Sequence, residues 1–239
     1  MQTLRNKVVL ITGGGQGLGK ATARALVKDG AKVILGDIND DQAKTTVAEL
    51  RQNGEQIENI HLDVGDRESV EETFKDIFER YGSIDVLINN AGVDVTKSVT
   101  DLSFDEWDKV LKVNLYGSFH TTKKFFELMG EKGGHIVNIS STAAKGAWEN
   151  AAAYHASKWG LLGFSHAMHV EGRAKNIKVT ALIAGGMKTP FIMERFPEAE
   201  PNLQDPKNVA ETIRYTLLQP DETVIPEVMV IPMKETSWP

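Results

Sequence analysis

KVVLITGGGQGLGKATARALVKDG, residues 7–30, joins a short β-branched run to an amphipathic segment through a loop of glycines. The run at 7–12 is typical of a buried strand, and residues 18–30 are typical of a helix that stops at a glycine. A strand followed directly by a glycine loop and a helix forms the first half of a βαβ unit. The stretch therefore predicts that the chain opens an α/β fold.

Six further apolar runs repeat the strand pattern. They lie at residues 32–38, 57–64, 84–90, 135–140, 178–184 and 227–232. Helical stretches such as 69–82 separate them and two-residue hairpin turns are missing, so we expect parallel strands with right-handed crossovers. Because the runs are mostly apolar, both faces of the sheet should be covered. The predicted fold is a Rossmann-type, doubly wound, seven-stranded parallel sheet with helices on both faces.

Length and composition indicate one domain spanning residues 1–239, with 41% hydrophobic and 25% charged residues. The net charge of −6 argues against a nucleic-acid partner. The chain has no cysteine, which excludes disulfides, thiolate metal sites and a cysteine nucleophile. It shows neither a signal-peptide core nor an apolar run of about 18 residues, so we expect a cytoplasmic protein that does not insert into a membrane.

The glycine loop places Gly13, Gly17 and Gly19 in a G-x-x-x-G-x-G spacing. This differs from the G-x-G-x-x-G dinucleotide fingerprint, but the physical consequence is the same. Residues without side chains let the backbone turn tightly and approach a pyrophosphate, whose charge is favoured at the following helix N-terminus. The alternative is a glycine-rich turn that serves only close packing between strand and helix.

Asp37 ends the second expected strand. In a Rossmann-type unit, an acidic residue about 20 positions after the loop accepts hydrogen bonds from the adenosine ribose. The same carboxylate repels a 2′-phosphate, and no arginine lies in 12–20 or 36–41 to offer that phosphate a partner. NAD is therefore expected rather than NADP. The alternative is a strand-end carboxylate that faces solvent.

Tyr154 and Lys158 stand one helical turn apart on one face if residues 153–175 form a helix. An adjacent ammonium and the positive nicotinamide ring would both lower the phenol pKa, so the tyrosine could exchange a proton with an alcohol or ketone. Ser141 closes the fifth strand, where doubly wound sheets bind ligands, and alternation alone leaves Ser140 as a competitor. A tyrosine and a lysine on an ordinary helix surface would share this spacing. The serine and the glycine loop favour chemistry.

Together these motifs resemble those of the short-chain dehydrogenase/reductase family from about residue 4 to 235. TGGGQGLG (12–19), NNAG (89–92), VNLYGSF (113–119) and YHASK (154–158) occur in the family's order. The resemblance implies that Tyr154 is the catalytic acid/base and that Ser141, not Ser140, binds the substrate oxygen. It further implies that Lys158 binds the nicotinamide ribose and that Asn114 holds a water in a proton relay.

The resemblance also implies a set of cofactor contacts spread over the glycine loop, the ends of four strands and the helix that carries Tyr154. They are Gly13, Gln16, Gly17, Leu18, Gly19, Asp37, Asp63, Val64, Asn90, Gly92, Tyr154, Lys158, Gly185, Met187 and Thr189. The chain departs from the family at Ala184, which replaces the usual proline before Gly185. Because alanine leaves φ free, we expect a less pre-organised loop without loss of activity.

Residues 188–206 have the composition of a mobile loop with an apolar underside, and we expect them to form a substrate lid that includes Phe191. A surface loop anchored by apolar contacts is the alternative. Trp148 either walls the substrate pocket or packs in the interior. The expected substrate contacts are therefore Ser141, Trp148, Tyr154 and Phe191.

Other polar residues are expected to have no part in the chemistry. His166 and His169 lie at i and i+3, but we expect no nearby carboxylate or thiol to complete a metal site, so no metal is predicted. His155 should point away from the cleft. Lys145 and Lys188 are expected to be solvated rather than to face an acidic substrate.

The sequence thus predicts an NAD-dependent oxidoreductase that interconverts a small-molecule secondary alcohol and a ketone. The alternatives are an NADP-linked 3-oxoacyl-carrier-protein reductase and a non-catalytic dinucleotide-sensing regulator. By resemblance alone, a homotetramer or homodimer is expected.

Overall fold

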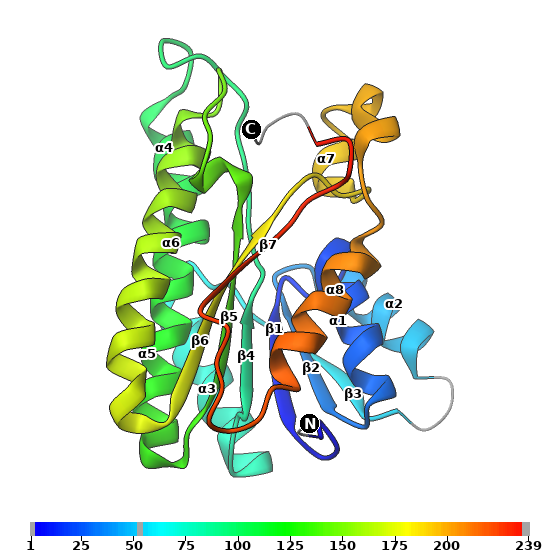
Figure 1. Ribbon diagram of the computed structural model, residues 1–239, viewed down its shortest axis with the longest axis vertical. Helices are drawn as coiled ribbons and strands as arrows, with labels where there is room; N and C mark the ends of the chain where they lie inside the picture. The colour runs from blue at the N-terminus through cyan, green and yellow to red at the C-terminus, as the bar shows by residue number, and fades with distance from the viewer. Residues whose placement is uncertain (1–2, 52–54, 236–239) are drawn as a thin grey trace.

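The computed structural model describes residues 3–51 and 55–235. Its seven strands form one parallel sheet in the order β3-β2-β1-β4-β5-β6-β7 (Figure 1). The strands are β1 (Val8–Thr12), β2 (Lys32–Asp37), β3 (Ile57–His61), β4 (Val86–Asn89), β5 (Gly134–Ser141), β6 (Ile177–Ala184) and β7 (Glu227–Val230). The predicted seven-stranded, doubly wound fold is confirmed.

Helices cover both faces of this sheet. They are α1 (Gly17–Lys28), α2 (Asp40–Leu50), α3 (Arg67–Tyr81), α4 (Phe104–Leu111), α5 (Ser118–Met129), α6 (Ala152–Gly172), α7 (Pro190–Met193) and α8 (Pro206–Leu217), with a π-helix at Lys112–Gly117 between α4 and α5. One face carries α1, α2 and α8, and the other carries α3, α5 and α6 (Figure 1). Within the described part of the chain, no helix combines the length and apolar character that a membrane span requires.

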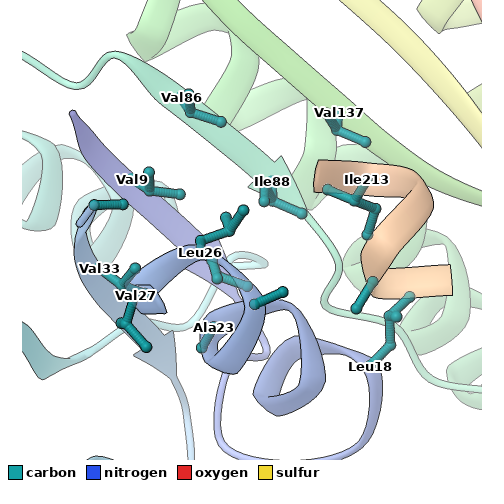
Figure 2. Packing of buried hydrophobic residues seen from close by; sticks show 14 of the residues in the cluster. Val9, Leu18, Ala23, Leu26, Val27, Val33, Val86, Ile88, Val137 and Ile213 are labelled. Carbon is teal, nitrogen blue, oxygen red and sulfur yellow. The ribbon is translucent and has the colours of Figure 1, made fainter. Parts of the chain in front are cut away.

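The two faces of the sheet belong to two hydrophobic clusters, because successive strand side chains point to opposite sides. In β1, Val9 and Ile11 join the cluster under α1 and α8, whereas Val8 and Leu10 join the cluster under α3 and α5. Figure 2 shows part of the first cluster, with Leu26 of α1 packed against the strands. This double burial explains why the strands read as nearly unbroken apolar runs.

A buried polar network ties the central strands to the helices of the second face. The Asn89 amide donates to the Asn138 side chain at 2.8 Å, and Asn138 in turn donates to Ser165 of α6 at 2.9 Å. The Thr121 hydroxyl of α5 donates to the side-chain amide oxygen of Asn89 at 2.7 Å. Asn89 and Asn138 form the last residue pair between β4 and β5. This network therefore fixes the position from which the loop after β4 begins.

Several expected boundaries differ from the structure. The third strand ends at His61 instead of residue 64, because the chain turns at Asp63, whose carboxylate accepts from the Gly65 amide at 2.8 Å. The expected helix 153–175 gives way to a 3₁₀ turn at Arg173–Lys175. Residues 188–206 are more regular than expected, since they contain α7 and a 3₁₀ helix at Pro197–Asn202.

We predict that Asn138→Ala lowers the free energy of unfolding by about 2–4 kcal/mol, because it leaves buried polar partners in Asn89 and Ser165 unsatisfied. Urea unfolding followed by circular dichroism measures this loss. The matched control is Asn208→Ala on exposed α8 surface, which should change stability by less than about 0.5 kcal/mol. Equal effects of the two substitutions would contradict the role of the network.

Candidate active site

A cleft of about 940 Å³ lies along the carboxyl ends of the strands. The cleft includes the crevice between β1 and β4, where the strand order reverses. The connections after these two strands run to opposite faces of the sheet, which opens a crevice between them. Nearly all of the expected site residues line it. They are Gly13, Gln16, Gly17, Leu18, Asp37, Asp63, Val64, Asn90, Gly92, Ser141, Trp148, Tyr154, Lys158, Gly185, Met187, Thr189 and Phe191.

The glycine loop needs its glycines for two separate reasons. Gly13 and Gly17 have φ angles of +62° and +54°, a conformation that side chains disfavour. A Cβ on Gly19 would lie 2.3 Å from the Gly13 carbonyl oxygen, so the start of α1 packs directly on the loop. The Asn90 side chain then donates to the Gly13 carbonyl oxygen at 2.9 Å and joins this loop to the one after β4. Gly19 therefore lies behind the cleft wall and supports it.

Asp37 lines the cleft, as expected for a residue beside the glycine loop. Its carboxylate accepts from the Gly15 amide at 2.8 Å and from the Asn39 amide at 2.9 Å. These bonds fix the carboxylate beside the glycine loop while each oxygen retains a second lone pair. Ile38, next in the chain, is exposed at the rim.

Ser141, Tyr154 and Lys158 come together where β5 meets α6. The Ser141 side chain acts on the Tyr154 hydroxyl, whose pKa it lowers, and the Lys158 ammonium lies 5.6 Å from the centre of the Tyr154 ring. Lys158 also donates to the Ile139 carbonyl oxygen at 2.8 Å. The competing Ser140 hydroxyl points to α6 instead, where it donates to the Lys158 carbonyl oxygen at 3.3 Å. The geometry therefore groups Ser141, not Ser140, with the tyrosine.

Burial governs the electrostatics of this group. It raises the pKa of Tyr154 to about 12, against a smaller lowering by the hydrogen bond from Ser141. Burial likewise lowers the pKa of Lys158 to about 8. Loss of solvation is the largest influence on Tyr154, and the lowering of its pKa expected from Lys158 and a bound nicotinamide stays a prediction. Both groups are held closer to their neutral forms than free side chains would be.

Asn114 lies behind the cleft, in the π-helix between α4 and α5. Its side chain forms a pair of hydrogen bonds with the backbone of Val93, at 2.8 and 2.9 Å. The same amide donates to Ser157 at 3.0 Å, and Ser157 donates to the Tyr154 carbonyl oxygen at 2.8 Å. Asn114 therefore connects the loop after β4 to the helix that carries the tyrosine. π-helical turns occur frequently at functional sites.

The loop after β6 is held in place although Ala184 replaces the family's proline. The Gly185 amide donates to the Val230 carbonyl oxygen at 2.9 Å, and the Gly186 amide donates to the Glu235 carboxylate at 3.0 Å. A Cβ on Gly185 would lie 2.5 Å from that carboxylate. The C-terminal segment therefore supplies the restraint that the missing proline would otherwise give.

Trp148 lines the cleft and is 41% exposed, so it does not pack in the interior, and its ring centre lies 4.3 Å from that of His155. His155 is not among the residues that line the cleft, as expected. Its ring hydrogen-bonds to the Ala143 carbonyl oxygen at 2.8 Å and receives a bond from the Trp148 amide at 3.2 Å. His155 thus holds Trp148 at the entrance.

The outlying polar residues need one correction. A carboxylate does lie beside His166, because Glu227 of β7 approaches it at 2.9 Å and also pairs with Lys145 at 2.8 Å. Distance along the sequence hid this contact. Lys188 pairs with Glu200 at 3.5 Å, so neither lysine is simply solvated. Within the described residues, no group of three or more ligand side chains could hold a metal ion.

Asp94 and Arg195 are among the cleft residues that were not identified as site residues from the sequence. Asp94, two positions after the NNAG motif, forms an ion pair with Arg195 of the 188–206 segment. Arg195 also donates to the Phe191 carbonyl oxygen at 2.9 Å and lies 4.4 Å from the centre of the Phe191 ring. A charged residue directly after a cofactor motif was the signal that sequence analysis did not use.

Comparison with known proteins places this fold and cleft in a defined class. The family model for short chain dehydrogenases matches residues 7–200, and the chain belongs to that family of oxidoreductases. An uncharacterized oxidoreductase, YxbG, of Bacillus subtilis (strain 168) is 40% identical over 193 residues, which cover 80% of this chain and 71% of that protein. One from Staphylococcus aureus (strain N315) is 30% identical over 98% of this chain and all of its own length.

Solved structures agree with this assignment. An alcohol dehydrogenase from the archaeon Thermococcus sibiricus, complexed with 5-hydroxy-NADP, superimposes with a TM-score of 0.90 at 30% identity, over 97% of this chain and 99% of its own. Levodione reductase superimposes with a TM-score of 0.88 at 29% identity, over 95% of this chain and 97% of its own.

We predict that Lys158→Met stabilises the protein at neutral pH. With a pKa near 8 in the folded state and 10.5 as its ordinary value, the lysine binds fewer protons when folded between those pH values. Its charge therefore costs stability below pH 8, by at most about 3 kcal/mol, and this cost disappears as the pH rises toward 10.5. Thermal melts at pH 7, 9 and 10 should show a gap between variant and parent that closes with rising pH.

The control is Lys75→Met, because Lys75 lies on the exposed surface of α3. This substitution should leave no gap that depends on pH. A Lys158→Met variant that melts below the parent at pH 7 would contradict the inferred cost of burying the ammonium.

Proposed function

We propose that this oxidoreductase interconverts a secondary alcohol and a ketone with NAD as its hydride carrier. The observation that carries the proposal is the grouping of Ser141, Tyr154 and Lys158 in the same cleft as the glycine loop. The structural neighbours support the reaction class, since one is an alcohol dehydrogenase and another a reductase.

The residues present fit a dinucleotide. The glycine loop offers a backbone free of side chains at the start of α1, where a Cβ on Gly13 would come within 2.9 Å of Ala91. Asp37, Asp63 and Val64 line the cleft beside that loop, at a position suited to adenosine. When bound, the nicotinamide accepts a hydride from the carbinol carbon or returns one to the carbonyl carbon.

Tyr154 exchanges the proton in this proposal. In the direction of oxidation Tyr154 takes the alcohol proton as tyrosinate, an ionised form that the positive nicotinamide ring of the bound oxidised cofactor and the Lys158 ammonium would favour. In the reverse direction the neutral tyrosine protonates the oxygen of the ketone. Ser141 donates a hydrogen bond to the substrate oxygen and orients it. Lys158 binds the nicotinamide ribose, and Asn114 keeps the loop and α6 in register for a proton relay. Met187 and Thr189 contact the nicotinamide side, while Phe191 and Trp148 hold the substrate within a lid formed by residues 188–206.

A regulator that binds the dinucleotide without catalysis is disfavoured, because the paired tyrosine and lysine are both present. NADP remains the cofactor of the second candidate function, the 3-oxoacyl-carrier-protein reductase, and a solved neighbour is complexed with an NADP analogue. Asp37 favours NAD, because its carboxylate is fixed in the cleft and would repel a 2′-phosphate.

We predict that Tyr154→Phe lowers kcat about 10²- to 10⁴-fold, because general acid–base catalysis is lost. Turnover is followed at 340 nm with a panel of hydroxyacyl, hydroxysteroid and polyol substrates and either cofactor. Calorimetric titration should show NAD affinity close to that of the parent protein. Tyr215→Phe, at an exposed position on α8, is the control and should keep full activity. Tight NAD binding by the parent without turnover of any substrate would refute the proposed reaction.

We predict that the parent protein binds NAD at least tenfold more tightly than NADP. The double substitution Asp37→Ser with Ile38→Arg should reverse this preference, because it removes the repelling carboxylate and gives the 2′-phosphate a guanidinium partner. Calorimetric titration of both dinucleotides measures the change. Asp41→Ser, which removes a fully exposed carboxylate on α2, should leave the preference unchanged. Tighter NADP binding by the parent would overturn the assignment of NAD.

A further inference from the structure

Asp94 has a carboxylate oxygen that the protein does not use. Its side chain is only 9% exposed, and its Oδ2 is paired with Arg195. Its Oδ1 is buried and has no hydrogen-bond partner among the described residues. Buried polar atoms in native proteins almost always have partners, so an isolated carboxylate oxygen in a binding cleft points to a donor on the ligand.

The position of Asp94 places that donor close to the reacting oxygen. Asp94 lines the same cleft as Tyr154 and Lys158, on the loop that carries Gly92. A Cβ on Gly92 would lie 3.8 Å from the Lys158 ammonium, so this loop runs directly past the catalytic lysine. The charge of Asp94 also raises the pKa of Tyr154 and opposes the lowering of the pKa of Lys158, as expected for a neighbour of both.

The surroundings select the kind of donor. Arg195 already neutralises the charge of Asp94, and Lys158 adds a second cation, so a substrate ammonium would meet net repulsion. A substrate carboxylate would compete with Asp94 for Arg195 and would face the unpaired oxygen. A neutral hydroxyl can donate to that oxygen without either cost. Trp148 and Phe191 make the rest of the wall apolar.

We propose that Asp94 determines specificity by accepting a hydrogen bond from a second hydroxyl of the substrate, so that the enzyme prefers diols and hydroxyketones with an apolar body over simple alcohols. This inference rests on the proposed function. One carbinol loses its C–H bond as hydride to the oxidised dinucleotide and its O–H proton to Tyr154, which leaves a carbonyl group. The second hydroxyl is unchanged and serves only for recognition.

The test compares substrates that share a carbon skeleton. Values of kcat/KM are measured for cyclohexanol, cyclohexane-1,2-diol and cyclohexane-1,3-diol with NAD and with NADP. We expect at least one diol to exceed cyclohexanol by about 10- to 100-fold, the range of a hydrogen bond to a charged acceptor. Asp94→Leu should remove most of this ratio, chiefly through a higher KM for the diol. Asp94→Asn, which keeps shape and polarity, should reduce the ratio less.

Arg195→Gln separates recognition from lid closure, because it breaks the ion pair but keeps the carboxylate. It should lower kcat/KM for all three substrates by a similar factor and leave the ratio of diol to alcohol largely intact. Calorimetric titration of the diol into Tyr154→Phe loaded with NAD, with and without Asp94→Asn, gives a readout that does not depend on turnover. The doubly substituted protein should bind the diol several-fold more weakly.

The possible failures are distinct. If no substrate of the wider panel is oxidised with either dinucleotide, the proposed function itself fails. If the alcohols are oxidised but neither diol is favoured, or if the ratio persists in Asp94→Leu and Asp94→Asn, the role of Asp94 is wrong while the proposed function stands. If Arg195→Gln abolishes the preference for the diol over cyclohexanol as fully as Asp94→Leu does, Asp94 acts only by holding Arg195. That outcome would overturn its role in recognition.

Discussion

The close approach of backbone to backbone at the glycine loop is the constraint on which the site depends. A Cβ on Gly19 would nearly coincide with the Gly13 carbonyl oxygen, so α1 can begin only where residue 19 lacks a side chain. That tight start brings the loop under Asn90, whose side chain donates to the carbonyl oxygens of both Thr12 and Gly13. The loops after β1 and β4 are thereby joined at the crevice where the strand order reverses. Gly13 and Gly17 of this packed loop also line the cleft in which we propose that the dinucleotide binds.

The part of the site formed by Tyr154 and Lys158 lowers the stability of the fold. Tyr154 and Lys158 occupy surroundings that disfavour their charged forms, and such groups cost stability that must be recovered elsewhere. The network of Asn89 and Asn138 binds β4 and β5 to α5 and α6, the last of which carries Tyr154 and Lys158. A polar support of this kind resists displacement of α6, because every member that moved would leave a buried partner unsatisfied.

Local patterns predicted most of the fold and the main chemical groups. Strand runs, the glycine loop and the spacing of Tyr154 and Lys158 are short-range features, and the structure retains each of them. What the sequence could not predict depends on tertiary contact. The direction of the Tyr154 pKa follows from burial, which spacing does not report. Glu227 meets His166, and Arg195 meets Asp94, only because the fold brings distant segments together.

The contact between Asp94 and Arg195 shows how such distant segments act together. Arg195 stacks on Phe191, and Phe191 lies with its ring centre 6.0 Å from that of Tyr154. A displacement of α7 would therefore remove the apolar wall beside the tyrosine and the cation beside Asp94 at the same time. With its cation gone, Asp94 would be a buried uncompensated charge, which is costly enough to favour return of the segment. One ion pair thus couples the loop after β4 to the 188–206 segment, so a change in the position of that segment would also change the charge beside Tyr154.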